Sequence, residues 1–157
     1  MTENFQQCSH LEIGDDFSKS TNTLSDLMTL QKNIQENVYG YNFESIQETV
    51  GSVKTFVDWN YAAIQDEFRE FYNALGGVHS HGAASWKPWK SAHKECLAKP
   101  FSDLTEEEKK ELHMEGIDIL HFVFNIFLAT GMTPEMVFNY YLAKNKENIA
   151  RQSKGNY

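Results

Sequence analysis

The sequence predicts an all-α fold, a bundle of helices with no β-sheet. Apolar residues recur at spacings of three and four over several long stretches, which is the period of an amphipathic helix. No stretch alternates apolar and polar residues in the way that predicts a strand. Capping residues precede the long stretches and glycines follow them, so the sequence also predicts where the helices begin and end.

The composition is that of a folded globular protein, with 41% hydrophobic and 23% charged residues in 157. We expect the polar residues 1–22 to form a loosely held N-terminal arm, and residues 23–157 to form a single domain. The net charge of -8 argues against a protein that binds the nucleic-acid backbone, which requires clustered lysines and arginines. Any nucleotide partner should therefore be a small molecule.

Neither a membrane span nor a signal peptide is predicted. The longest apolar run, residues 117–130, is interrupted by Asp118, His121 and Asn125 and is shorter than the roughly 20 residues that a bilayer requires. The two cysteines show no paired spacing, which a reducing compartment permits. These observations favour a cytoplasmic protein.

The first helix is expected to begin at Thr23, with Thr23 as N-cap, and Gly40 ends the pattern. Gln31 and Gln35 fall on its inward side among apolar residues. A side-chain amide both donates and accepts, so a buried glutamine that is free to turn over can bind the edge of a base. Alternatively, these glutamines fill gaps in the core or reach solvent.

A second helical tract is expected over residues 43–75, with a possible break near Gly51, and glycines stop it. Its apolar stripe comprises Phe56, Val57, Ile64, Phe68, Phe71 and Leu75. Glu67 and Glu70 lie three residues apart within this stripe, and so their carboxylates should lie side by side.

A cluster of lysines and indoles follows at residues 86–90. Pro88 cannot lie inside a helix, and we expect it to open a short one that carries Lys90 and Lys94. Lysines bind phosphate as point charges and indoles offer a flat face for stacking. A partly buried pair of tryptophans with solvated lysines is an equally good explanation of this segment.

A capping box at residues 105–108 predicts the start of a long apolar helix that ends at Gly131. This helix contains a second acid pair, Glu115 and Asp118. One Glu-x-x-Glu pair alone usually lies on a solvated helix face. A solvated helix face does not explain a second acid pair inside a segment this apolar, because a bare buried carboxylate is very costly to desolvate.

The last helix is expected to begin after Thr133, with Pro134 at its first position. We expect its core side to comprise Met136, Val137, Tyr140, Tyr141 and Ile149. If the two acid-bearing helices pack together, four carboxylates converge. Hard oxygen ligands without cysteine suit magnesium or manganese.

Four segments carry a resemblance to a known superfamily, in addition to the acid pairs. They are residues 30–35 (Leu-Gln-Lys-Asn-Ile-Gln), 86–90 (Trp-Lys-Pro-Trp-Lys), 118–122 (Asp-Ile-Leu-His-Phe) and 144–152 (Lys-Asn-Lys-Glu-Asn-Ile-Ala-Arg-Gln). The ordered set resembles the all-α nucleoside triphosphate pyrophosphatases, which include the MazG proteins and the dimeric dUTPases. Within that superfamily the chain is most similar to the enzymes of T-even phages that act on dCTP and dUTP.

The resemblance implies magnesium-dependent hydrolysis of dCTP and dUTP to the monophosphate and pyrophosphate, which adjusts the deoxypyrimidine pool during phage DNA replication. Manganese could substitute for magnesium. The implied metal ligands are Glu67, Glu70, Glu115 and Asp118, with Glu67 or Glu70 as the catalytic base. The implied substrate contacts are Gln31, Gln35, Trp86, Lys90, Lys144, Asn148 and Arg151. The resemblance also implies a homodimer in the host cytoplasm.

Three alternatives remain open at this point. The chain could be a dUTP-specific dimeric dUTPase or a broader MazG-like pyrophosphatase. A protein of another class is the di-iron carboxylate bundle, which Asp118-x-x-His121 beside Glu67-x-x-Glu70 resembles in part. That bundle requires a second carboxylate-x-x-His pair on another helix, and the sequence places none there.

Overall fold

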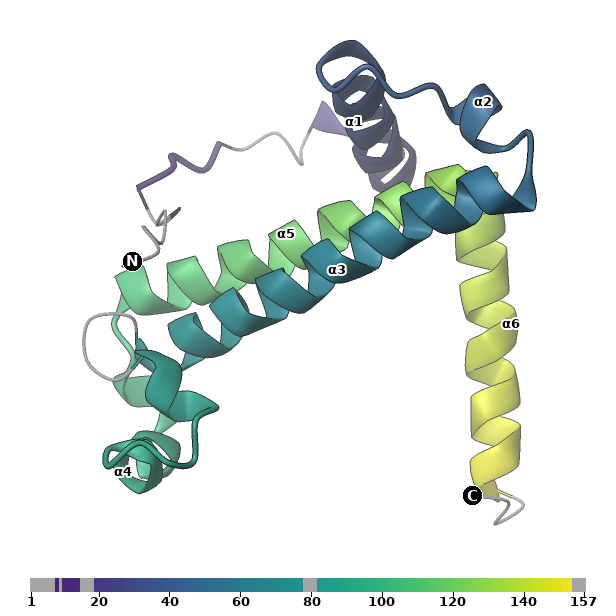
Figure 1. The fold of residues 1–157 in the computed structure, drawn as a ribbon. Helices are drawn as coiled ribbons and strands as arrows, with labels where there is room; N and C mark the ends of the chain where they lie inside the picture. Colours follow the sequence, from purple (N-terminus) through teal and green to yellow (C-terminus); the bar gives the residue numbers. More distant parts are fainter. Residues whose placement is uncertain (1–7, 9, 15–18, 78–81, 154–157) are drawn as a thin grey trace. The chain divides into compact units, whose positions relative to one another are not determined.

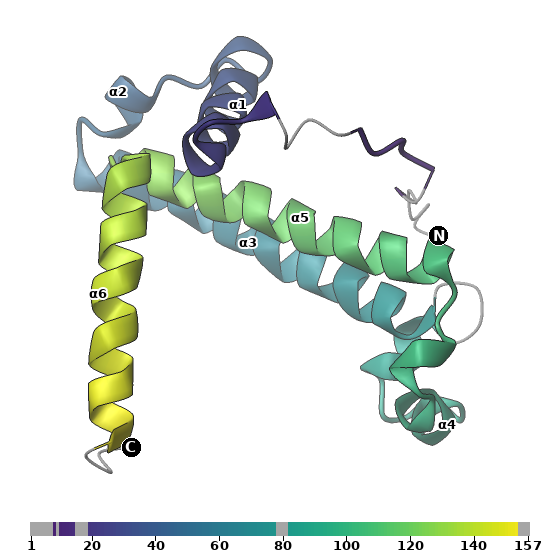
Figure 2. The same ribbon diagram turned by 180° about the vertical axis from the view of Figure 1, so that it is seen from behind.

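The computed structural model describes residues 8, 10–14, 19–77 and 82–153 (Figures 1 and 2). Every regular element in these ranges is helical, which confirms the predicted all-α class. The α-helices are α1 (Thr23–Asn37), α2 (Phe43–Ile46), α3 (Val50–Leu75), α4 (His93–Ala98), α5 (Glu106–Ala129) and α6 (Pro134–Ser153). Two 3₁₀-helices, η3 (Gly82–Ser85) and η4 (Phe101–Asp103), flank α4.

The chain divides into two compact units. The first comprises residues 1–15 and 59–123, and the second comprises residues 16–58 and 124–157. The long helices α3 and α5 each contribute to both units. Parts of the predicted N-terminal arm, and residues 154–157 of the predicted domain, lie outside the described residues.

In the first unit, the later part of α3 lies antiparallel beside the earlier part of α5 (Figures 1 and 2). The segment between them is tied to the end of α3 by hydrogen bonds. The Ser85 hydroxyl donates to the Tyr72 carbonyl oxygen, and the Trp86 Nε1–H donates to Asn73 Oδ1 at 2.8 Å. These bonds hold the lysine and tryptophan segment against the helix that carries Glu67 and Glu70.

The second unit has a small apolar core. Its buried residues are Phe43, Ile46, Phe56 and Ala129, with Val53 and Leu128 packed against them. The Phe43 ring meets the Phe56 ring edge to face at a centroid distance of 5.7 Å, a favourable arrangement for aromatic pairs. Gln47 Nε2 donates to the Leu128 carbonyl oxygen at 2.8 Å and so joins the α2–α3 turn to the end of α5.

The predicted signals for the two C-terminal helices are confirmed. The Thr105 N–H donates to Glu108 Oε2 at 2.9 Å, and the Glu108 N–H donates to Thr105 Oγ1 at 3.1 Å, which is a complete capping box. Thr133 Oγ1 accepts from the Met136 N–H at 3.2 Å and caps α6. Gly131, at φ +73°, terminates α5 in the left-handed region that glycine favours.

Two predicted boundaries were wrong and one was confirmed. The N-cap of α1 is Asn22, not Thr23, because Asn22 Oδ1 accepts the Ser25 N–H at 3.2 Å. The helical tract over residues 43–75 is interrupted between Ile46 and Val50, close to Gly51 as predicted. Pro88 opens no helix. Residues 86–92 form successive turns, and α4 begins only at His93.

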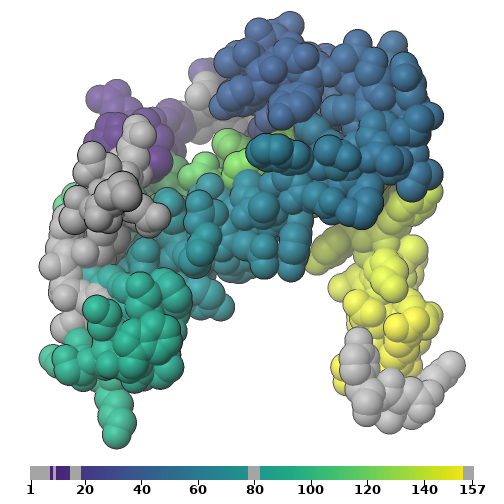
Figure 3. Space-filling view, viewed as in Figure 1, coloured from purple at the N-terminus to yellow at the C-terminus, as the bar shows by residue number. Residues whose placement is uncertain are grey.

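Predicted core positions on α6 were also wrong for the single chain. No described residue of α6, which is drawn in yellow in Figure 3, is buried. Tyr141 and Ile149 are 70% and 64% exposed. Phe68 on α3 is likewise 44% exposed. Helical periodicity predicts which residues share a face, whereas only a packed partner buries that face.

One described helix, α5, has the length and mean hydropathy that would allow it to cross a membrane. In the chain, 28% of its most apolar window is buried. The helix also carries the buried acids Glu108, Glu111 and Glu115.

Candidate active site

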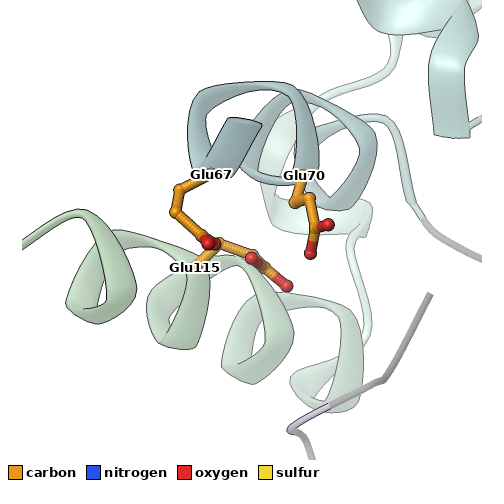
Figure 4. A group of neighbouring side chains, drawn as sticks. All are labelled: Glu67, Glu70 and Glu115. Carbon is orange, nitrogen blue, oxygen red and sulfur yellow. The ribbon is translucent and has the colours of Figure 1, made fainter. Parts of the chain in front are cut away.

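Three carboxylates from two helices converge in the first unit. Glu67 and Glu70 on α3 and Glu115 on α5 each place an oxygen within 4.8 Å of the others. Figure 4 shows the three side chains reaching toward one another across the gap between the helices. The spacing of three residues sets Glu67 and Glu70 on one face of α3, and the antiparallel packing brings Glu115 opposite them. We call these three residues the acid cluster.

The acid cluster is partly withdrawn from water, and its charges repel one another. Burial, followed by the charges of Glu70 and then Glu111, raises the pKa of Glu115 from 4.5 to about 8. Burial, followed by the charge of Glu70, raises the pKa of Glu67 from 4.5 to about 7. Without a counter-charge, the cluster therefore retains protons near neutral pH. A divalent cation is the natural replacement for those protons.

Asp118, the fourth predicted ligand, lies beside the acid cluster but outside the group of three. Its charge raises the pKa of both Glu67 and Glu115, so it is close to them. Its own side chain is 38% exposed, and Asp118 Oδ1 lies 3.8 Å from His121 Nδ1. Burial raises the pKa of Asp118 and the His121 charge opposes that rise. The structure thus brings three of the four predicted ligands together and leaves the fourth adjacent.

The predicted tryptophan and lysine contacts lie in the same unit as the acid cluster. Trp86 is half-buried and fixed through Asn73, and Lys87 Nζ lies 4.4 Å from the centre of the Trp86 ring. Lys90 is exposed, and its N–H donates to the Lys87 carbonyl oxygen at 3.0 Å. Trp89 is 73% exposed. The two indoles therefore differ, because one is anchored and the other faces solvent.

The two predicted glutamines lie on α1 in the second unit. Both are buried, at 7% exposure each, as their inward position predicted. Gln31 Nε2 donates to Asn125 Oδ1 at 2.8 Å. The Gln31 amide therefore cannot turn over alone, because Asn125 would have to turn with it. Sequence reasoning missed Asn125 as a site residue, although a buried asparagine inside an apolar run was a signal.

The remaining predicted contacts, Lys144, Asn148 and Arg151, are exposed on α6 in the second unit. Arg151 Nε donates to Glu147 Oε1 at 2.8 Å, an ion pair one helical turn apart. An exposed pair of this kind contributes little stability. Arg151 could exchange this partner for a ligand at small cost.

Sequence reasoning also missed Glu111, which is 1% exposed and lies one helical turn before Glu115. Its Oε2 accepts the Cys8 N–H at 2.8 Å. The spacing of Glu111, Glu115 and Asp118, at i, i+4 and i+7, was the available signal, since these positions share a helix face.

The chemistry of the donor set fits a hard divalent cation. All three convergent atoms are carboxylate oxygens, and neither cysteine nor histidine belongs to the described group. The di-iron alternative requires histidine beside the acids, whereas the His121 side chain is 53% exposed next to Asp118. The described group thus contains only the oxygen ligands that magnesium and manganese bind, and it lacks the histidine that the di-iron alternative requires.

Comparison with known proteins finds relatives encoded by phages. The chain is 33% identical over 168 residues to the dCTP pyrophosphatase of Enterobacteria phage LZ5 and 32% identical over 167 residues to that of phage T4. Both alignments cover 96% of this chain and 98% of the relative. A phage T4 protein named DNA replication protein is 31% identical over 158 residues, which are 90% of this chain and 40% of that protein. No family model matches the chain. No solved structure matches it significantly.

Proposed function

Since the chain belongs to the phage dCTP pyrophosphatase family, we propose that it hydrolyses dCTP, and dUTP as well, to the nucleoside monophosphate and pyrophosphate. The convergence of Glu67, Glu70 and Glu115 is the observation that carries this proposal. Hydrolysis of a triphosphate requires the negative charges of its phosphates to be neutralised. Cations bound by an acid cluster can neutralise them.

The proposed cofactor is magnesium, for which manganese could substitute. Glu67, Glu70 and Glu115 would hold it, and Asp118 is placed to complete the set. When bound, the cation would neutralise charge on the triphosphate and lower the pKa of a coordinated water molecule. The proposal is supported by an oxygen-only donor set in which burial and the neighbouring carboxylate charges raise the pKa values of Glu67 and Glu115.

Glu67 or Glu70 would accept the proton of the attacking water. Both are half-buried carboxylates on α3, and the pKa of Glu67 lies at about 7 in the metal-free chain. A base whose pKa lies near the working pH transfers protons most effectively. The two residues are equivalent candidates for this role.

The other proposed residues bind the phosphates and the nucleoside. The proposed phosphate contacts are Lys90, Lys144 and Arg151, and the proposed nucleoside contacts are Gln31, Gln35, Trp86 and Asn148. Because Gln31 donates to Asn125, acceptance of both cytosine and uracil through Gln31 would require the two amides to turn over together. Base choice is therefore proposed to depend on the Gln31 and Asn125 pair rather than on Gln31 alone.

We also propose that the chain belongs to the MazG-like all-α pyrophosphatase superfamily.

We propose in addition that the chain forms a homodimer. Several apolar side chains of the second unit are exposed in the single chain. They are Leu30, Ile34, Phe138, Tyr140, Tyr141 and Ile149, on α1 and α6. A second copy would bury them, as an obligate interface buries apolar surface. Multi-angle light scattering of Tyr141→Asp tests this, because the variant should be monomeric where the wild type is dimeric.

The proposed cellular role is adjustment of the deoxypyrimidine nucleotide pool in the host cytoplasm during phage DNA replication. The likeness to part of a T4 DNA replication protein supports this setting. The net charge of -8 supports a nucleotide substrate rather than direct nucleic-acid binding.

Product analysis with purified protein tests the proposed activity. Incubation of dCTP with the protein and magnesium should give dCMP and pyrophosphate in equal amounts, and excess chelator should stop the reaction. Release of orthophosphate, or a rate that chelator leaves unchanged, would contradict the proposal. Bound iron with an oxygen-dependent reaction would instead support the di-iron alternative.

A further inference from the structure

Glu111 is a buried acid that the proposed reaction does not use. Its side chain is 1% exposed, although it does not belong to the acid cluster. A carboxylate is costly to withdraw from water unless it is paired or hydrogen-bonded, and so its position requires an explanation. Its Oε2 accepts the main-chain N–H of Cys8 at 2.8 Å, across 103 residues of sequence.

The neighbouring residue of α5 holds the same part of the N-terminal arm. Lys110 Nζ donates to the Leu11 carbonyl oxygen, and the Leu11 N–H donates to the Cys8 carbonyl oxygen at 3.0 Å. We call Cys8 and Leu11, joined by this hydrogen bond, the arm clip. Two consecutive residues of α5 thus hold the arm clip, and both bind main-chain groups.

The arm clip lies next to the acid cluster, because the Glu111 carboxylate that accepts the Cys8 N–H at 2.8 Å lies one helical turn before Glu115 on the same face of α5. In agreement with this, burial and then the charges of Asp118, Glu111, Glu115 and Glu70 raise the pKa of the Cys8 thiol. Glu115 is 2% exposed. The arm clip, which Glu111 holds one helical turn away, is placed to shield this carboxylate from water on one side.

We infer that Glu111 is a positioning residue that holds the arm clip as a wall of the acid cluster, and that Cys8 and Leu11 are thereby part of the active site. This inference rests on the proposed function. Excluding water from one side strengthens the attraction between the carboxylates and a cation, because charges interact more strongly where the dielectric constant is low. Outer residues that orient metal ligands act in the same way and typically contribute about 10- to 100-fold to metal affinity or activity.

The first experiment measures alkylation of Cys8 in chelator, so that neither metal nor activity is involved. Glu111→Ala removes the acceptor, and we expect iodoacetamide to modify Cys8 about fivefold faster, since a hydrogen bond to a charged acceptor is lost. Glu111→Gln removes the charge, which by itself lowers the pKa of the Cys8 thiol, but keeps an oxygen acceptor, and we expect its rate to lie between those of the wild type and Glu111→Ala. Glu12→Ala, an exposed acid of the same arm, is the matched control.

Peptide mapping separates the two cysteines. Cys96 is 9% exposed and should react slowly in every folded variant, so that rapid modification of both cysteines identifies unfolding. A Glu111→Ala rate equal to that of the wild type would overturn the inference. Equal acceleration by Glu111→Ala and Glu111→Gln would also overturn it, because the effect would then come from charge alone.

The second experiment measures hydrolysis and leaves Glu111 intact, so it does not depend on whether a Glu111 variant folds. Cys8→Pro removes the N–H that Glu111 accepts, and Cys8→Ala removes only the thiol. We expect Cys8→Pro to raise the magnesium concentration that gives half-maximal dCTP hydrolysis about tenfold. The KM for dCTP at saturating magnesium should stay within about twofold of the wild-type value. Cys8→Ala should match the wild type, and equal values for the two variants would show that the arm clip does not serve the reaction.

Magnesium-dependent thermal shifts of the same variants distinguish the two ways of failing. If no variant hydrolyses dCTP but Cys8→Pro still requires about tenfold more magnesium than the wild type for the same rise in Tm, the proposed function is wrong and the inference about the arm clip is supported. If the wild type hydrolyses dCTP and both Cys8 variants show identical shifts and activation, the arm clip fails and the function stands.

Discussion

Replacement of Glu115 by glutamine should stabilise the metal-free protein at alkaline pH, although the residue is a proposed metal ligand. Glu115 is buried, and its pKa rises from 4.5 to about 8 because of burial and the neighbouring acids. The folded state therefore binds more protons than the unfolded state between these values, and wild-type stability falls as the pH rises through that interval. Glutamine is neutral throughout and escapes this loss.

The size of the effect follows from the pKa. Each unit of pKa corresponds to about 1.4 kcal/mol, so the raised value of Glu115 costs the wild type about 4 to 5 kcal/mol above pH 8. Side-chain movement and the entry of water relieve part of such a cost in a real protein. We therefore expect a net gain of about 2 kcal/mol, or about 4 to 8 °C in Tm for a chain of this size.

Thermal unfolding followed by circular dichroism in excess chelator measures this gain. The difference between Glu115→Gln and the wild type should be small at pH 5, widen toward pH 8 and then level off. Added magnesium should raise the Tm of the wild type more than that of the variant. Glu48→Gln, an exposed acid between α2 and α3, is the control and should change stability by less than about 0.5 kcal/mol. A variant less stable than the wild type at pH 8.5, or a difference that is the same at every pH, would refute the reasoning.

Three further predictions concern turnover, base choice and helix capping. Glu70→Gln and Asp118→Asn should each lower kcat about a hundredfold or more while circular dichroism stays unchanged, because an amide cannot supply the charge that holds a cation; near-normal rates at saturating magnesium would remove that residue from the ligand set. In competition among the four deoxynucleoside triphosphates and dUTP, dCTP and dUTP should be hydrolysed with specificities within about tenfold of each other. Exclusive use of dUTP would indicate a dUTPase, and comparable use of dATP would indicate the broader MazG-like group. Thr105→Ala should lower the free energy of unfolding by about 1 kcal/mol in urea titrations, since it removes one half of the capping box, whereas the exposed Ser102→Ala should have little effect.

Local sequence signals predicted most of the helices correctly. The capping box at Thr105 and the cap at Thr133 act over three residues, so the sequence contains all the information that they require. Where several local solutions compete, the choice depends on backbone geometry. Asn22 rather than Thr23 caps α1, and the turns after Trp86 delay α4 until His93.

The pairs Glu67 with Glu70 and Glu115 with Asp118 were visible in the sequence because residues three apart share a helix face. That Glu115 rather than Asp118 joins the group of three depends on how α5 is rotated against α3, which no local signal specifies.

By itself, the sequence determined the helical class, the caps of α5 and α6 and the two acid pairs, because each of these depends on residues within one or two helical turns. The tertiary structure decided which groups meet across long stretches of chain: Gln31 with Asn125, and Glu111 with the main chain of Cys8. Such contacts require distant segments to be packed first, and a buried polar group then selects the partner that satisfies it. On α6 the local pattern predicted an apolar face, but packing within one chain does not cover that face.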